Sequence, residues 1–246
     1  MTEPAFYTFG ETRDGPWVVT CDHASNRVPE EIGGGDLGLA SEDMNRHIAF
    51  DIGAAGVAEA LADHLGAVAL LSNFSRLVID PNRGEDDPTL VMKLYDGTII
   101  PANRDVDAAE TARRLEAYYR PYGNAVAGAL AARPNPILVS VHSFTPQFKG
   151  RPPRPWHVSV LHTEDMRLAD PLLTALREDG DWVVGVNEPY TGKLEGDAVD
   201  RYATSQGRPN ALIEIRNDLI SDGAGQQDWA QRLARCLTQA REAAGL

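Results

Sequence analysis

The chain has 246 residues, of which 43% are hydrophobic, and it carries a formal net charge of −13 at pH 7. That size and apolar content suit one domain with a sizeable core. No linker-like stretch divides the chain, so we expect a single domain over residues 1–246. The acidic background contains no basic block, which argues against a nucleic-acid or anionic membrane partner.

The cysteines and the N-terminal residues indicate where the protein works. Cys21 and Cys236 are the only cysteines, and a disulfide framework is not expected from one in a buried strand and one in a late helix. The chain does not start with a charged segment followed by an apolar one, and no apolar run approaches the length of a membrane span. We therefore expect a cytoplasmic protein, and the sequence leaves its oligomeric state open.

Short apolar, β-branched runs alternate with longer segments of helical periodicity. The expected strands cover residues 17–21, 67–71, 76–80, 137–141, 157–161, 182–186 and 210–215. The expected helices cover residues 41–64, 107–133 with a break at Pro121, 165–178 and 228–244. This alternation predicts βαβ units and an α/β fold with a mainly parallel sheet. The long polar segment 81–103 is expected to be a loop that is either functional or disordered.

Two histidines follow two of the expected strands. His23 comes just after the run WVVTC, and His142 comes just after ILVSV. Open α/β sheets bind their ligands at the carboxyl ends of strands. Either histidine alone would more often be structural, but together they favour a metal site of the kind found in metal-assisted hydrolases.

Glu214 stands in the apolar strand ALIEI. A buried carboxylate must be paired or poised for chemistry, because burying it unpaired is costly. The structural alternative is an ion pair with Arg216, two residues along on the same strand face. The functional alternative is a general base that activates water.

The arginines near the segment LVIDPN suggest how an anionic substrate is bound. Arg83 follows this segment, and we expect it to bind the substrate carboxylate, since a guanidinium matches a carboxylate in shape and charge. The structural alternative is a surface pair with Asp80 or Glu85. Arg76 precedes the segment, so the two arginines are expected at its opposite ends.

Six short motifs, in order, resemble the N-formylglutamate amidohydrolase family, in the branch described as predicted members. They are CDHASNRVPEE, RHIAFDIGA, FSRLVIDPNR, VSVHSFTP, NEPYTG and LIEIRNDLI, and they cover most of the chain. The resemblance implies a three-layer α/β fold similar to that of zinc carboxypeptidases, with a mixed, mainly parallel sheet between helices. It also implies hydrolysis of N-formyl-L-glutamate to formate and glutamate, a step of histidine degradation.

The resemblance assigns roles at the metal site. His23 and His142 match two zinc-binding histidines, and one zinc ion per chain is implied. Asn26 stands where the carboxypeptidase-like proteins have a ligand glutamate, and an amide oxygen is a poor zinc ligand. His47 is therefore the expected substitute, with Asp51, one helical turn further on, as an alternative.

The resemblance also assigns roles in chemistry and in substrate binding. Glu214 matches the general base. The implied reaction also needs an arginine to stabilise the tetrahedral oxyanion, and Arg76 is the expected residue. Arg83 with Asn82 is similar to a clamp for the substrate carboxylate, and Tyr190 is similar to a mobile tyrosine that faces the substrate. Ser143, next to His142, completes the expected substrate-binding set.

Two other functions compete with this one. The first is a metal-dependent amidase or carboxypeptidase that acts on a different N-acyl amino acid or a small peptide. The second is a ligand-binding protein that kept the pocket and lost the metal, which the absent carboxylate at Asn26 suggests. Retention of both histidines and Glu214 argues against the second, because a binding site has no need of a buried base.

Overall fold

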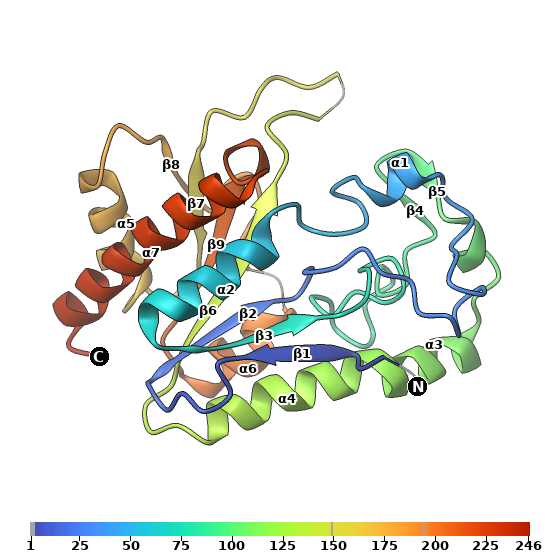
Figure 1. The fold of residues 1–246 in the computed structure, drawn as a ribbon, viewed down its shortest axis with the longest axis horizontal. Helices are drawn as coiled ribbons and strands as arrows, with labels where there is room; N and C mark the ends of the chain where they lie inside the picture. Colours follow the sequence, from blue (N-terminus) through green and yellow to red (C-terminus); the bar gives the residue numbers. More distant parts are fainter. Residues whose placement is uncertain (1–2, 149, 194) are drawn as a thin grey trace.

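The computed structural model describes residues 3–148, 150–193 and 195–246. Its centre is a seven-stranded sheet in the order β1-β3-β2-β6-β9-β7-β8 (Figure 1). β1 is antiparallel to β3 and β7 is antiparallel to β9, whereas every other neighbouring pair is parallel. The strands are β1 (Phe6–Phe9), β2 (Trp17–Cys21), β3 (Val68–Ser72), β6 (Ile137–Phe144), β7 (Val158–Leu161), β8 (Val184–Val186) and β9 (Asn210–Arg216).

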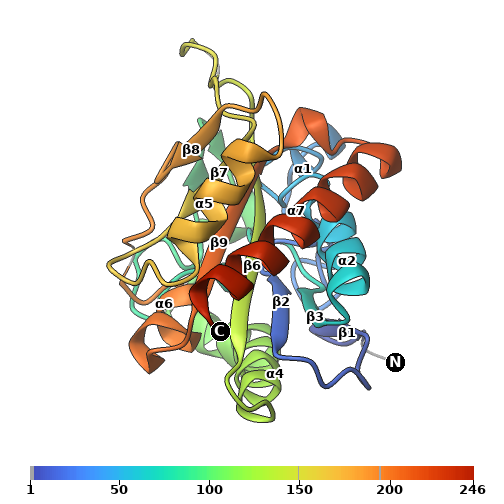
Figure 2. The same cartoon turned by 90° about the vertical axis from the view of Figure 1, so that its left-hand side faces the viewer.

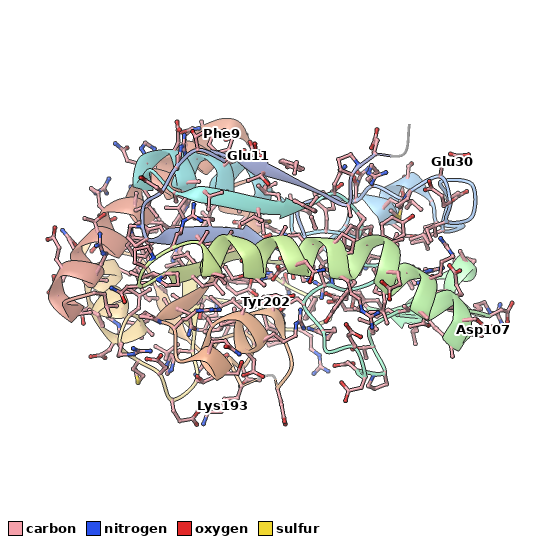
Figure 3. The ribbon with its side chains drawn as sticks, turned by 90° about the horizontal axis from the view of Figure 1, so that it is seen from below. Phe9, Glu11, Glu30, Asp107, Lys193 and Tyr202 are labelled. Carbon is pink, nitrogen blue, oxygen red and sulfur yellow. The ribbon has the colours of Figure 1, made fainter. Side chains whose placement is uncertain are left out.

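Helices cover both faces of this sheet, which confirms the expected three-layer α/β fold. α2 (Ala54–Leu65), α5 (Ala169–Glu178) and α7 (Gly223–Ala244) lie together on one face (Figures 1 and 2). α3 (Ala108–Arg114), α4 (Arg120–Ala131) and α6 (Ala198–Tyr202) belong to the opposite side. Figure 3 shows α4 running along that side, with Tyr202 of α6 below it.

The strand pattern sorts side chains between these two layers. Successive residues of a strand point to opposite faces. In β6, Val139 and Val141 pack in the core beneath α2 and α7, whereas Leu138 packs in the core on the α4 side. In β9, Ile213 belongs to the first core and Leu212 to the second. The even-numbered positions of both strands therefore face the α4 and α6 side.

The remaining elements are short. They are α1 (Ser41–Met44), the hairpin strands β4 (Leu94–Tyr95) and β5 (Thr98–Ile99), and turns of 3-10 helix at Pro101–Asn103, Thr204–Gln206 and Asn217–Leu219. α3 joins α4 through a π-helical turn, Leu115–Tyr119. This turn ends two residues before Pro121, which lacks the N–H that regular helical bonding would use. The expected break near Pro121 is therefore a local change of helix type.

Two expected elements differ in the structure. The helix predicted for residues 41–64 is two helices, because the chain leaves helical geometry after Met44 and re-enters it after Gly53 at a φ of 80°. The strand predicted for residues 76–80 is a series of turns, in which the Ser75 hydroxyl accepts the N–H of Leu77. The apolar side chains Leu77, Val78 and Ile79 are nevertheless fully buried, which explains why the segment resembles a strand in sequence.

β1 was not expected, and it extends the sheet by an antiparallel edge strand beside β3. Across the described residues, no helix is long and apolar enough to cross a membrane. The single-domain organisation stays a prediction.

Candidate metal centre and active site

Three buried side chains from distant parts of the chain meet at one end of the sheet. His23 follows β2, His142 lies near the end of β6, and Asp51 lies in the segment between α1 and α2. The backbone N–H of Asp51 donates to the His23 carbonyl at 2.9 Å, which attaches that segment to the strand end. The candidate ligand atoms of His23, Asp51 and His142 all lie within 4.8 Å of one another.

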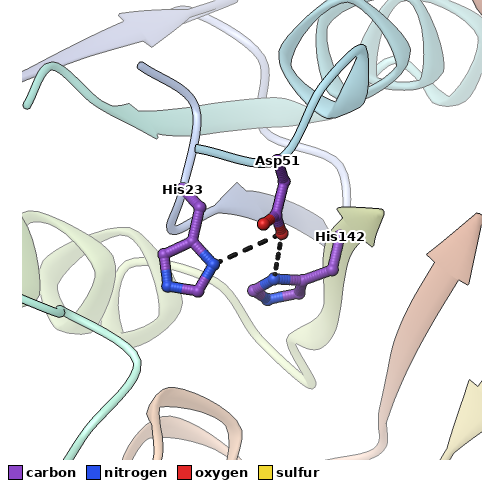
Figure 4. A group of neighbouring side chains, drawn as sticks. All are labelled: His23, Asp51 and His142. Atoms are coloured by element: carbon purple, nitrogen blue, oxygen red, sulfur yellow. Dashed lines mark hydrogen bonds and ion pairs between the residues drawn. The ribbon is translucent and has the colours of Figure 1, made fainter. Parts of the chain in front are cut away.

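The two histidines turn the same ring nitrogen toward the carboxylate (Figure 4). Asp51 Oδ2 lies 2.8 Å from His142 Nδ1 and 3.3 Å from His23 Nδ1. Burial opposes ionisation of Asp51, but the charges and hydrogen bonds of both histidines hold the pKa of this carboxyl below its usual range. The atoms that could bind a cation therefore converge on one point.

The second ring nitrogen, Nε2, of each histidine faces a carboxylate outside the His23–Asp51–His142 cluster. His23 Nε2 is 2.7 Å from Asp80 Oδ1. His142 Nε2 is 3.0 Å from Ser140 Oγ and 3.4 Å from Asp22 Oδ2. Burial alone would lower the pKa of His142, but hydrogen bonds to Asp22 and Asp51 hold it well above its usual value.

This donor set fits a divalent metal ion. Two imidazoles and a carboxylate are a known ligand set of catalytic zinc sites, which keep a further position open. Metal-binding histidines commonly donate their second ring N–H to a carboxylate, which fixes the ring and its tautomer. Asp80 and Asp22 stand in that relation to His23 and His142.

Glu214 is a buried carboxyl that forms no ion pair with any described residue. It is a Cα partner of His142 across β6 and β9, and both residues occupy even-numbered positions on the α4 and α6 side. Its Oε2 is buried and has no hydrogen-bond partner within the part of the chain that the structure describes. Burial, with the nearby charge of Asp51, raises the pKa of Glu214 to about 7, although the neighbouring histidines act in the opposite direction. Arg216 instead pairs with Asp218 at 2.8 Å, so the structure does not contain the ion pair considered as an alternative.

A cavity of about 280 Å³ opens beside these groups. The sequence-predicted residues that line it are His23, His47, Arg76, Asn82, Arg83, His142, Ser143, Tyr190 and Glu214. The sequence therefore identified most of the polar wall of one pocket. The substrate-binding roles proposed for these residues stay predictions.

The two arginines of the cavity have different surroundings. Arg76 pairs with Asp80 at 2.7 Å, its Nη1 lies 3.6 Å from Asp51 Oδ1, and its guanidinium covers the ring of Tyr95 at 5.3 Å. Arg83 donates from Nη1 to the Asn82 carbonyl and from Nε to the hydroxyl of Thr89. Within the described residues Arg83 forms no ion pair, so neither Asp80 nor Glu85 neutralises it as the surface alternative required.

Asp51, rather than His47 or Asn26, lies with the two histidines. His47 borders the cavity, but its Nε2 is 3.4 Å from Asp96 and its ring lies 5.5 Å from that of Phe148. Burial lowers the pKa of His47. The Asn26 amide donates to the Met44 carbonyl at 2.9 Å. Of the alternatives that the sequence left open, the geometry therefore favours Asp51.

Ser143 supports this arrangement from the next position of β6. Its backbone N–H donates to Asp51 Oδ2 at 3.3 Å, and its hydroxyl donates to the Ile52 carbonyl at 2.9 Å. Both contacts hold the segment that carries Asp51. Ser143 also lines the cavity, so the expected contact with substrate is compatible with this structural role.

Sequence reasoning missed several residues of the site. Asp22 accepts the Tyr122 hydroxyl at 2.7 Å while it faces His142, and Asp80 contacts both His23 and Arg76. Asp197, which caps α6, also lines the cavity. Asp22 directly precedes His23, so a search for carboxylates beside the histidines would have found it. Asp80 is 57 positions from His23 and belongs to the motif FSRLVIDPNR, which was the only sequence signal for it.

An α/β sheet with a buried His–Asp–His cluster beside an unpaired glutamate has the layout of a hydrolase that activates water. A comparison with protein families matches residues 15–221 to N-formylglutamate amidohydrolase. The chain belongs to this family, and it is therefore an amidohydrolase-type enzyme, a class that acts on small molecules. No curated protein matches the sequence.

Two solved structures have the same fold, and a third gives a weaker match. A gene product from Agrobacterium tumefaciens is 32% identical with a TM-score of 0.93, and the match covers 99% of this chain and 97% of that one. N-formylglutamate amidohydrolase from Ralstonia eutropha JMP134 is 23% identical with a TM-score of 0.75, over 98% and 100% of the two chains. A putative carboxypeptidase A from Shewanella denitrificans OS-217 is 11% identical with a TM-score of 0.44, over 99% and 64%.

Proposed function

We propose that this enzyme uses a metal ion to hydrolyse the amide bond of an N-formyl or other N-acyl amino acid. The observation that carries the proposal is the convergence of His23, Asp51 and His142 within 4.8 Å, beside a buried carboxyl with an unpartnered oxygen. Zinc is the ion that this donor set suits best. N-formyl-L-glutamate is the first substrate to assay, because the family is named for its hydrolysis.

The proposed chemistry divides between the metal and the protein. A divalent ion held by His23, Asp51 and His142 would polarise the acyl carbonyl and lower the pKa of water. Glu214 accepts a proton from the attacking water and returns one to the leaving amine. A carboxyl whose pKa is about 7 can do both near neutral pH.

Two arginines complete the proposed mechanism. Arg76 is held through its Nε and Nη2 by Asp80, which leaves Nη1 near the cluster to stabilise the oxyanion. Arg83, with Asn82, binds the substrate α-carboxylate, since its guanidinium lines the cavity without an ion pair among the described residues. Tyr190 lines the cavity and is 37% exposed, as suits a residue that covers bound substrate.

Elemental analysis of the purified enzyme tests the metal site. We expect about one zinc ion per chain in the wild type and its loss in a His23→Ala/His142→Ala double variant. Release of formate from N-formyl-L-glutamate and from other N-acyl amino acids then tests the reaction. A wild type that binds no metal after zinc loading and removal of excess would refute the metal-dependent mechanism. Metal binding without hydrolysis of any such amide would refute the proposed reaction.

A further inference from the structure

Arg201 of α6 binds the backbone of the segment that is proposed to hold the substrate carboxylate. Its Nη2 donates to the Pro81 carbonyl at 2.7 Å, and its Nη1 donates to the Arg83 carbonyl at 2.8 Å. The same Nη1 also donates to the carbonyl of Gly196, two residues before α6. One guanidinium therefore joins residues 81–83 to the chain that leads into α6.

Two tyrosines flank this guanidinium. The Cζ atom of Arg201 lies 5.1 Å from the ring centre of Tyr119 and 5.1 Å from that of Tyr202. The Tyr119 hydroxyl also donates to the Arg83 carbonyl, at 2.6 Å, so that carbonyl accepts two hydrogen bonds. A guanidinium combines a planar, fixed set of donors with stacking on aromatic rings, which an ammonium group does not. The position therefore uses the shape of arginine as well as its charge.

Asn82, between the two bound carbonyls, is fixed as well. Its backbone N–H donates to Asp80 Oδ1 at 2.9 Å, and its side-chain oxygen accepts the N–H of Ala198 at 3.0 Å. Within the described residues, the Arg83 guanidinium hydrogen-bonds only to the Asn82 carbonyl and the Thr89 hydroxyl. The direction of the Arg83 side chain therefore depends mainly on its own backbone, which Arg201 holds.

Arg201 itself does not reach the substrate cavity. Among the described residues, Asn82 and Arg83 line that cavity and Arg201 does not. Burial raises the pKa of Asp197, another lining residue, to about 6, and the positive charge of Arg201 opposes this rise. Two routes therefore connect Arg201 to a bound substrate: its hydrogen bonds to residues 81–83 and its charge. Arg201→Lys separates them, because it keeps the charge and removes the planar set of donors.

We propose that Arg201 is a positioning residue for substrate binding: it holds the backbone of residues 81–83 so that Arg83 and Asn82 meet the substrate α-carboxylate. This inference rests on the proposed amide hydrolysis and deepens it, since it explains how the carboxylate site is kept in place before substrate arrives. A displacement of about 1 Å in a positioning group can cost about 100-fold in rate.

Steady-state kinetics on the zinc-loaded enzyme test the inference. For N-formyl-L-glutamate, Arg201→Lys should raise KM by about 10- to 100-fold with little change in kcat, as expected when substrate binding alone is weakened. N-formyl-L-isoglutamine has an amide in place of the α-carboxylate, so its kcat/KM should differ little between Arg201→Lys and the wild type. Arg208→Lys is the matched control, because Arg208 donates to the Tyr202 carbonyl and not to residues 81–83.

Binding measurements keep the inference testable if turnover fails. Calorimetry with N-formyl-L-glutamate on the zinc-loaded Glu214→Gln variant compares Arg201→Lys, Arg83→Gln and their combination without hydrolysis. Because Arg201 acts through Arg83, adding Arg201→Lys to Arg83→Gln should cause little further loss of affinity. That result would support the inference even if the wild type hydrolysed no amide, and only the proposed function would then fail.

Four results would overturn the inference. Additive losses in the double variant would show that the two arginines act independently. Wild-type affinity in Arg201→Lys would show that charge alone suffices. Loss of zinc from Arg201→Lys would assign the residue to the fold as a whole. Absence of ligand binding before any change to Arg201 would remove the carboxylate site itself. Release of formate by the wild type would leave the proposed function standing in each case.

Discussion

His142 and Glu214 are direct Cα partners across the parallel strands β6 and β9. Their side chains leave the sheet on the same face, because both follow the even-numbered register of Leu138 and Leu212. The strand pairing thus places a candidate metal ligand beside the unpaired carboxyl group without help from any loop. A rigid sheet is a good scaffold for such a pair, since catalytic groups must be held to within a fraction of an ångström.

This pairing leads to the first prediction. Glu214→Gln should lower kcat by about 10²- to 10⁴-fold, the usual contribution of a general base, while zinc content stays unchanged. Steady-state kinetics and elemental analysis measure the two effects. The matched control is Arg216→Gln on the same strand, whose side chain pairs with Asp218 and does not line the cavity. Equal losses of activity in the two variants would contradict a catalytic role for Glu214.

The second prediction concerns the third metal ligand. Loss of a group that hydrogen-bonds to a metal ligand typically weakens metal binding by about 10- to 100-fold. Asp51→Asn should weaken zinc binding by more than this, because it changes a proposed ligand. His47→Gln should leave zinc affinity close to that of the wild type, because His47 lies outside the cluster. Competition with a chelator of known affinity measures both. The assignment fails if His47→Gln loses zinc and Asp51→Asn retains it.

The third prediction concerns Asp22, the carboxylate that faces His142 from outside the cluster. Asp22 faces His142 Nε2 and is fixed by the hydroxyl of Tyr122. Asp22→Asn should lower zinc affinity by about 10- to 100-fold, since the imidazole loses the partner that orients it. Asp14→Asn removes an exposed carboxylate and controls for the change in net charge. Unchanged zinc affinity in Asp22→Asn would show that Asp22 does not orient the ring.

The sequence predicted the parts of the site that depend on strands. His23 and His142 follow buried β-branched runs, and parallel strands end at a common edge, so their proximity could be inferred. Glu214 was identified because a charged residue within an apolar strand is unusual. The layered fold followed from the same alternation of strands and helices.

Asp51 could not be selected in this way, because its position depends on long-range contacts. Periodicity predicted one helix through residues 41–64, in which His47 and Asp51 would share a face. The chain instead turns irregularly between Met44 and Ala54, and a backbone bond from Asp51 to His23 spans 28 positions. Asp51 offers a carboxylate next to the two histidines, and the lack of one at Asn26 was the reason for considering a metal-free binding protein.

The last prediction concerns α3, the helix that fixes the turns after Arg76. At the start of α3, Glu110 pairs with Arg113 and Arg114, at 2.7 and 2.8 Å. Arg114 in turn donates to the Val78 carbonyl and to Asn103, which fixes the turns that follow Arg76. Hydrogen bonds from Arg113 are the largest influence on Glu110, and with those of Arg114 they lower its pKa to about 2.

Because this pKa is lowered on folding, ionised Glu110 stabilises the protein above its unfolded pKa of about 4.5. That contribution is lost as the pH falls toward 2. The pair is partly exposed, so solvent limits the effect to about 0.3–1 kcal/mol. Glu110→Gln should therefore be less stable than the wild type in urea at pH 7, and the difference should shrink between pH 4.5 and pH 3. Glu11→Gln, in an exposed turn, controls for the loss of one charge. A stability difference that stays constant or grows on acidification would show that Glu110 does not act through its ionised form.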